Sequence, residues 1–191
     1  MTKEETFCPT NSQEWRKWLE KNHEKKQSVW LICYKKSSDK PTLNWSDAVD
    51  EALCFGWIDS TKRSIDEESY MQYYGKRKPN SMWSKINKQK VEKLIADGRM
   101  TYAGFAAIET AKQNGSWTLL DQVEELIIPD DLEAAFSKHS GSKDFFLSQS
   151  RSIKKGMLAW IVLAKRNETR QKRINEIAKC AEKGIRPRHF D

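Results

Sequence analysis

The hydrophobic positions in the first part of the chain follow two different spacings. Trp15, Trp18 and Leu19 recur at the spacing of a helix face, behind polar residues at 10–14 that are typical of a helix start. Residues 28–34 form a short β-branched and aromatic run, which predicts a buried strand. The chain is therefore expected to open with a strand, a helix and a second strand.

A second helix and a hairpin are predicted next. Ser46 is a suitable N-cap for an apolar helix that should end at Gly56. Two short strands follow, near residues 60–65 and 70–74. Acidic residues at 66–68 separate these strands, and we expect them to form the hairpin turn.

From residue 79 onward the hydrophobic spacing is helical. Helices are expected over residues 82–96 with Ser81 as N-cap, from Thr101 to Asn114, over residues 130–138 behind Pro129, and over residues 153–182 before Gly184. We therefore predict an α+β protein, with a small antiparallel sheet and its helices over residues 1–79 and a helical part over residues 80–191. Because no low-complexity linker separates the two parts, we expect them to pack as one body.

Composition supports a folded chain with a charged surface. Only 38% of the 191 residues are hydrophobic and 32% are charged, but eight Trp, seven Phe and five Tyr are too many aromatic residues for a disordered protein. The longest apolar run, residues 157–164, is too short to span a bilayer, and residues 1–10 lack the apolar stretch of a signal peptide. We expect a cytoplasmic protein without a membrane span.

Cysteine and histidine spacing excludes the common metal motifs. The four cysteines are scattered without a C-x-x-C pair, and none of the three histidines stands at ligand spacing. No phosphate-binding glycine loop, nucleophile elbow or H-E-x-x-H motif occurs either. We therefore expect no metal, no cofactor and no catalytic residue.

The net charge of +7 is unevenly distributed along the chain. Residues 61–100 hold ten basic and five acidic residues, and residues 151–191 hold twelve basic and four acidic residues. Residues 101–150, between these two basic blocks, hold three basic and eight acidic residues. If the two basic blocks meet in the fold, they make a positive face for an anionic partner. If they do not meet, the excess is an ordinary solvated surface.

One polar cluster is a candidate ligand site. It consists of Asp59, Arg63, Arg77, Trp83 and Asn87. Asn87 falls where the predicted helix should be apolar. Arginine suits an anionic ligand because its guanidinium can donate two parallel hydrogen bonds, and tryptophan offers a surface on which a ligand can stack. The predicted helix start at Ser81 also favours an anion. The alternative is a structural network in which Asp59 pairs with an arginine and the tryptophans are core.

A second cluster is basic. Arg166, Arg170 and Arg173 share one helix face at i, i+4 and i+7, a ridge able to neutralise phosphates. The alternative is a solvated helix face, because no aromatic residue stands between these arginines to stack on bases.

Four motifs resemble one known family. They are EALCFGWID at 51–59, PxSxWSxxN at 79–87, GRMTxAG at 98–104 and AKRxETRxxRI at 164–174. Together, over roughly residues 7–184, they resemble the YdeI/OmpD-associated family, also called bacteriocin-protection proteins. The resemblance implies a YjbR/CyaY-like, frataxin-like N-terminal part, a helical C-terminal part and a bacterial stress or bacteriocin-protection context, but no defined reaction.

The chain also departs from the family pattern. Lys78 stands in place of an arginine, and Tyr102 and Asn167 stand in place of prolines. A lysine at 78 makes a bidentate contact there doubtful, whereas the lost prolines concern helix starts more than chemistry.

These observations favour a non-catalytic protein that binds a small polar or anionic ligand or a protein partner. A nucleic-acid-associated regulator is the first alternative, supported by the two basic blocks. Metal handling by frataxin-like analogy is the second; such a role would need a carboxylate-rich surface in the α+β part, and the acidic residues at 121–131 lie outside it.

Overall fold

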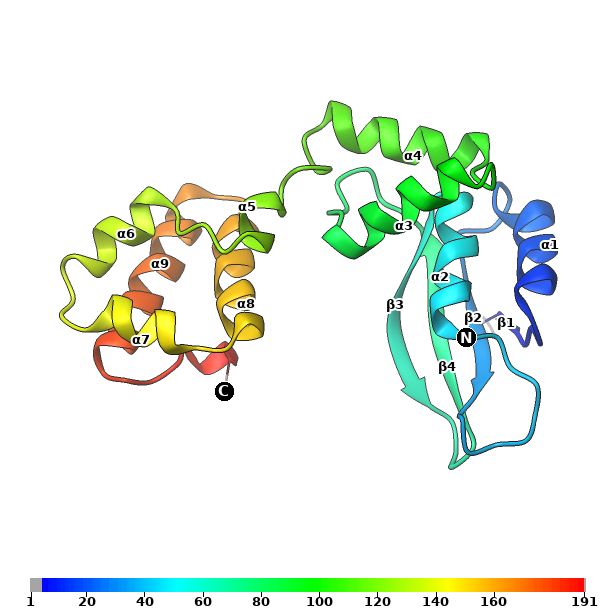
Figure 1. Cartoon of the computed structure of the whole chain (residues 1–191), viewed down its shortest axis with the longest axis horizontal. Helices are drawn as coiled ribbons and strands as arrows, with labels where there is room; N and C mark the ends of the chain where they lie inside the picture. Colours follow the sequence, from blue (N-terminus) through cyan, green and yellow to red (C-terminus); the bar gives the residue numbers. More distant parts are fainter. Residues whose placement is uncertain (1–4, 191) are drawn as a thin grey trace. The chain divides into compact units, whose positions relative to one another are not determined.

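The computed structural model describes residues 5–190 and divides into two compact units after Trp117. We call them the N-terminal unit and the C-terminal unit; each has its own cluster of buried hydrophobic side chains. The N-terminal unit contains β1 (Thr6–Phe7), α1 (Ser12–Asn22), β2 (Ser28–Tyr34), α2 (Trp45–Cys54), β3 (Trp57–Ser64), β4 (Ser69–Lys76), α3 (Lys85–Ala96) and α4 (Tyr102–Gln113) (Figure 1).

The four strands form one mixed sheet in the order β1-β2-β4-β3. This confirms the predicted α+β class and the opening strand, helix and strand. The prediction of an antiparallel sheet needs one correction, since β1 pairs with β2 in parallel, whereas β2, β4 and β3 pair antiparallel. The reason is α1, which carries the chain back between β1 and β2, as a parallel pair requires.

The β3–β4 hairpin turns at residues 66–68, as predicted. The Asp66 carboxylate accepts hydrogen bonds from the backbone N–H groups of Glu68 and Ser69, at 2.9 and 2.6 Å, and from the Ser69 hydroxyl at 2.8 Å. These local bonds hold the pKa of Asp66 below its usual value. The turn thereby fixes the pairing of the adjacent residues, such as Lys62 with Gln72. An irregularity between Asp59 and Lys62 then shifts the register, and beyond it Ile58 pairs with Gly75.

Each strand presents alternate residues to opposite faces of the sheet. Val29, Leu31 and Cys33 of β2 belong to the buried cluster that also holds residues of α1 and α2. Because side chains alternate along β4, Tyr73 and Gly75 lie on the face opposite to that of Tyr74, which is buried in this cluster. The pocket described below lies on the face of Tyr73 and Gly75.

Helices α3 and α4 belong to the N-terminal unit. Val91 and Leu94 of α3, and Ile108 and Ala111 of α4, lie in the same buried cluster as the sheet. The sequence changes from strands to helices at residue 79, but the structure divides after Trp117. The two positions differ because α3 and α4, although helical, share their buried side chains with the sheet. That the two parts pack as one body stays a prediction.

The start of α4 docks on the end of α2. The backbone N–H and the hydroxyl of Thr101 donate to the Cys54 carbonyl, at 3.1 and 2.6 Å. A Cβ atom on Gly104 would lie 2.4 Å from the same carbonyl oxygen, so only glycine permits this approach. Gly56, with a φ of +69°, ends α2, and its carbonyl accepts from the Arg77 N–H at 2.9 Å. The docking therefore fixes the backbone at Arg77.

The C-terminal unit is helical. It contains α5 (Asp121–Glu124), α6 (Asp130–Phe136), α7 (Ser142–Ser148), α8 (Arg151–Val162), α9 (Asn167–Glu182) and the 3₁₀ turn η1 (Arg188–Phe190) (Figure 1). The prediction of one helix over 153–182 is wrong: the chain turns after Leu163, and Arg166 has an extended backbone before α9. Ile161 and Ile174 both enter the one buried cluster of this unit, and the turn lets α8 and α9 pack together.

Candidate functional site

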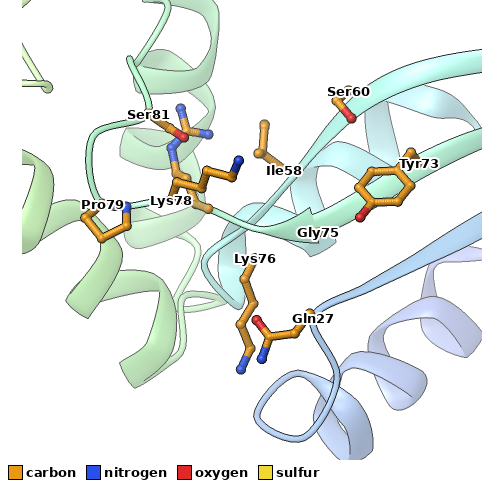
Figure 2. A pocket seen from close by; sticks show the side chains of 10 residues that line it. Gln27, Ile58, Ser60, Tyr73, Gly75, Lys76, Lys78, Pro79 and Ser81 are labelled. Carbon is orange, nitrogen blue, oxygen red and sulfur yellow. The ribbon is translucent and has the colours of Figure 1, made fainter.

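A pocket of about 610 Å³ lies at the end of β4 in the N-terminal unit (Figure 2). Its size is within the range of sites for small molecules. It is lined by Gln27, Ile58, Ser60, Tyr73, Gly75, Lys76, Arg77, Lys78, Pro79 and Ser81.

The register of the hairpin brings the lining together. Ile58 of β3 stands opposite Gly75 of β4, and Tyr73 lies two residues before Gly75 on the same face. A Cβ atom on Gly75 would lie 3.2 Å from the Gln27 carbonyl oxygen and 3.3 Å from the Tyr73 ring. Glycine at this position therefore lets the Tyr73 ring and the Gln27 backbone pack closely over β4.

Arg77 follows β4 and is the most constrained charge of the site. Its Nη2 atom donates to the Met82 carbonyl at 2.6 Å, and its guanidinium carbon lies 3.7 Å from the centroid of the Trp83 ring. The Nε and Nη1 atoms are buried and have no hydrogen-bond partner within residues 5–190. Buried N–H donors without acceptors are uncommon in folded proteins, and a ligand oxygen would reach those of Arg77 only if the side chains that cover them moved aside.

The pocket is electrostatically positive. Burial lowers the pKa of Arg77 to about 10, opposed by the negative charge of Asp59, so the guanidinium keeps its proton at neutral pH. Lys76 and Lys78 flank Arg77; the Lys76 ammonium donates to the Glu24 carbonyl at 2.8 Å, and Lys78 is exposed. Among the described residues that line the pocket there is no carboxylate. The arrangement suits an anion.

Of the residues predicted from the sequence, Arg77 lines this pocket, and Asp59 lies within electrostatic reach. Trp83 stacks on Arg77 but is 1% exposed and belongs to the buried cluster, as in the alternative in which the tryptophans are core. Asp59 influences the Arg77 charge, but its carboxylate is engaged by the Trp45 indole N–H at 2.9 Å and the Gln72 amide at 3.3 Å. Asp59 is thus held within the unit by hydrogen bonds.

Arg63 and Asn87 lie elsewhere in the N-terminal unit. The Arg63 guanidinium carbon lies 4.4 Å from the centroid of the Trp30 ring, toward the turn of the hairpin. Asn87 lies in the first turn of α3, where its backbone N–H donates to the Ser84 hydroxyl at 3.3 Å. Neither residue lines the pocket. That Asp59, Arg63 and Asn87 bind a ligand stays a prediction.

Ser81 lines the pocket but does not start a helix. The N-cap of α3 is Ser84, so the predicted helix over 82–96 begins three residues later, at Lys85. Residues 77–83 form the connection from β4 to α3 instead, and the Ser81 N–H donates to the Lys78 carbonyl at 2.9 Å. The expected anion site at a helix start is therefore absent at Ser81 within the described chain.

Sequence reasoning missed the sheet side of the pocket. Ser60, Tyr73 and Gly75 were not among the predicted site residues, because nothing in their local sequence suggests a ligand. Two signals were present in the sequence. Residues 76–78 are three consecutive basic residues, and Gly75 stands two residues before Arg77 inside a strand, where glycine is unfavourable. These signals indicate a site only if β4 extends to Lys76, whereas the predicted strand ended at residue 74.

The three arginines of the predicted basic ridge are largely engaged within the C-terminal unit. Arg170 binds the Asp131 carboxylate with two nitrogens, at 2.7 and 2.9 Å. Arg173 donates to the Trp160 carbonyl, and its guanidinium carbon lies 5.1 Å from that ring. Arg166 is exposed at the start of α9. Phosphate binding by this ridge stays a prediction, and the pairing of Arg170 argues against it.

Tyr102 and Asn167, the residues that replace prolines of the resembled family, are the first residues of α4 and α9. This is the helix position at which proline is best tolerated. These departures therefore concern helix starts, as expected from the sequence.

Within residues 5–190, no group of three or more His, Cys, Asp or Glu side chains is arranged to hold a metal ion. Each helix described here is too short or too polar to cross a bilayer.

Comparison with known families separates the two units. Residues 7–107 match the family model described as "Domain of unknown function (DUF8412)". Residues 125–184 match the family model "Bacteriocin-protection, YdeI or OmpD-Associated". The resemblance to YdeI/OmpD-associated proteins is thereby confirmed for the C-terminal unit, whereas the frataxin-like arrangement stays a prediction. No curated protein and no solved structure gives a significant match.

Proposed function

We propose that this chain, which belongs to the family described as a domain of unknown function (DUF8412), is a non-catalytic protein that binds a small anion in the pocket of Lys76, Arg77 and Lys78. The observation that carries the proposal is the Arg77 guanidinium, whose Nε and Nη1 atoms are buried without acceptors. Leaving a buried donor unsatisfied costs about 1–3 kcal/mol. Oxygen atoms of a carboxylate or phosphate would recover this free energy through charge-assisted hydrogen bonds.

The positions of the three cations support the same ligand class. Arg77 is pre-oriented by the Trp83 ring and the Met82 carbonyl, so little side-chain entropy remains to be lost on binding. Lys78 is exposed and adds a mobile charge at the pocket mouth. Because the described lining residues include no acidic side chain, an anion in the pocket contacts no carboxylate directly.

Binding without catalysis is favoured by the kind of groups that line the pocket. They are cations, hydroxyls, an amide and apolar side chains, and within the described lining neither a histidine nor a carboxylate is present. Those two types are the usual general acids and bases of enzymes. The pocket can hold and orient an anion, and this is the role that we assign to it.

The biological setting is part of the proposal. The match of residues 125–184 to the bacteriocin-protection, YdeI or OmpD-associated model supports a role in bacteriocin protection or a stress response, in the cytoplasm. The proposal favours a small anion over nucleic acid, because Arg170, which would contribute to a nucleic-acid surface, already binds Asp131.

Isothermal titration with inorganic pyrophosphate and with citrate at low ionic strength tests the proposal. Lys78→Gln removes one charge from the pocket at an exposed position, and Lys93→Gln removes the same charge from an exposed position of α3 outside it. We expect Lys78→Gln to weaken binding about tenfold, the effect of one charge-assisted hydrogen bond. Lys93→Gln should leave the affinity unchanged.

Two results would contradict the proposal. One is an equal loss of affinity in both variants, which would mean that the anions follow net charge and not the pocket. The other is that neither anion binds the unmodified protein at millimolar concentration.

A further inference from the structure

We infer that the anion held by this pocket carries a flat, unsaturated ring, which stacks on Tyr73. The inference rests on the proposed anion site and concerns the rest of the ligand. Figure 2 shows the pocket in two parts: Lys78 and Ser81 lie at one end, Tyr73 and Ser60 lie at the other, and Ile58 and Gly75 lie between them. A molecule that fills the pocket therefore meets cations at one end and an aromatic ring at the other.

Gly75 lies beneath the aromatic side of the pocket. Its partner across the hairpin is Ile58, and Tyr73 lies two residues before it on the same face. The place of a Cβ atom at position 75 is already bordered by the Gln27 carbonyl oxygen at 3.2 Å and by the Tyr73 ring at 3.3 Å, so Tyr73 itself packs over the glycine. The ring of a ligand would therefore lie against Tyr73 and not on the backbone of Gly75.

Tyr73 supplies a fixed aromatic wall. Its ring meets the buried Trp30 ring edge to face, with the centroids 5.1 Å apart and the planes at 75°. This contact holds the Tyr73 side chain in place before a ligand arrives, so stacking costs little ordering entropy. A flat ring gains from such a wall, and a short anion such as acetate or phosphate does not reach it.

One polar group near the ring end refines the ligand class. Ser60 is exposed and offers a hydroxyl there, whereas Figure 2 shows the Gln27 side chain beside Lys76. A hydroxyl hydrogen-bonds to ring nitrogens, ring oxygens or attached hydroxyls. The ligand class is therefore an aromatic or heteroaromatic carboxylate or phosphate, and a cavity of about 610 Å³ accommodates molecules up to the size of a nucleoside monophosphate.

Two matched pairs of probes test this inference by isothermal titration. Benzoate and cyclohexanecarboxylate differ in ring flatness at the same charge, and adenosine monophosphate and ribose 5-phosphate differ in the presence of the base. We expect the flat-ring member of at least one pair to bind about tenfold more tightly, as stacking of one ring provides. The pair that shows this preference identifies the anion as carboxylate or phosphate.

Tyr73→Leu tests where the preference arises, since leucine keeps apolar bulk against Trp30 but removes the stacking wall. The variant should lose the preference for flat rings and keep the affinity for ribose 5-phosphate. The comparison of probes on the unmodified protein needs no variant, so it remains decisive if Tyr73→Leu fails to fold.

The outcomes separate the inference from the proposed function. If ribose 5-phosphate or cyclohexanecarboxylate binds, depends on Lys78 and is not improved by a flat ring in either pair, the ring inference is overturned and the anion site stands. If none of the four probes and neither pyrophosphate nor citrate binds, the anion site itself is overturned.

Discussion

Arg170 of the C-terminal unit and Arg77 of the N-terminal unit are held in opposite ways. In the C-terminal unit, Arg170 forms a two-nitrogen ion pair with Asp131, whereas in the N-terminal unit Arg77 is held by a tryptophan ring and a carbonyl and keeps two buried nitrogens without acceptors. A cation already bound to a carboxylate has little to offer a ligand. The difference teaches that local charge excess is a poor guide to an anion site, and that unused hydrogen-bond donors are a better one.

The distribution of acidic residues explains this difference. The acidic block of residues 101–150 lies mostly in the C-terminal unit, where it supplies partners to the basic block of residues 151–191. Asp131 of α6 binds Arg170 of α9, and Glu124 of α5 binds Lys155 of α8 at 2.6 Å. The second basic block is therefore partly neutralised within its own unit.

The N-terminal unit also contains one strongly paired carboxylate. Glu51 is 4% exposed and binds Arg16 at 2.9 Å and Arg99 at 2.7 Å. Although burial alone lowers the pKa of Arg16, its hydrogen bond to Glu51 and the attraction between their charges raise it overall. This carboxylate joins α1, α2 and the segment before α4, so it serves the fold and not the pocket.

Glu51→Gln should cause the largest loss of stability among these substitutions. It removes the buried charge that both arginines bind, and breaking a buried ion pair destabilises by about 3 kcal/mol. Urea denaturation should show this loss in the free energy of unfolding, with a cooperative transition. A loss below about 1 kcal/mol would mean that Glu51 is no better paired than a surface carboxylate.

Gly104→Ala should have an intermediate effect. Its new Cβ atom would lie 2.4 Å from the Cys54 carbonyl oxygen, and the backbone there must move. Such overpacking costs about 1–3 kcal/mol, and the movement should also weaken anion binding because the same docking holds the backbone at Arg77. Thermal denaturation and pyrophosphate titration measure the two effects.

Gly156→Ala in α8 is the matched control for this substitution. Its Cβ atom would lie 3.1 Å from the Phe190 ring, a side chain near the C-terminus that can shift. We expect a smaller loss of stability than for Gly104→Ala and unchanged anion binding. If the two alanine substitutions had equal effects on stability and on anion binding, the α2–α4 contact would not have the role that we assign to it.

Asp131→Asn should have the smallest effect, and its pH dependence is the informative part. Hydrogen bonds from Arg170 hold the pKa of Asp131 below its ordinary value, against the effect of partial burial. The stabilisation is therefore complete above the unfolded-state pKa of about 4 and is lost as pH falls through the lower folded-state value. At pH 7 the variant should lose about 0.5–1 kcal/mol, as expected for a partly exposed ion pair.

Urea denaturation of both proteins at several pH values checks this expectation. The difference in the free energy of unfolding should be constant from pH 7 to about pH 5 and should close toward pH 2. A difference that stays constant down to pH 2 would show that the ion pair does not account for it.

Features set by neighbouring residues were predictable from the sequence. The hairpin turn depends on bonds from Asp66 to residues two and three positions away, and the end of α2 depends on the backbone freedom of Gly56. Arg77 and Trp83 are six residues apart, and their meeting was expected. In each case the groups are close in sequence, so local geometry limits where they can lie.

Features that depend on residues far apart in the chain were decided only by tertiary structure. Asp131 and Arg170 are 39 residues apart, and no local pattern indicates that the acid neutralises the predicted ridge. The pocket needs Gly75 to stand opposite Ile58, which depends on strand register. The sequence thus determined most of the elements and the proximity of Arg77 to Trp83. Packing across the chain decided which charges are paired, because ion pairs and pockets form between surfaces that the sequence does not place.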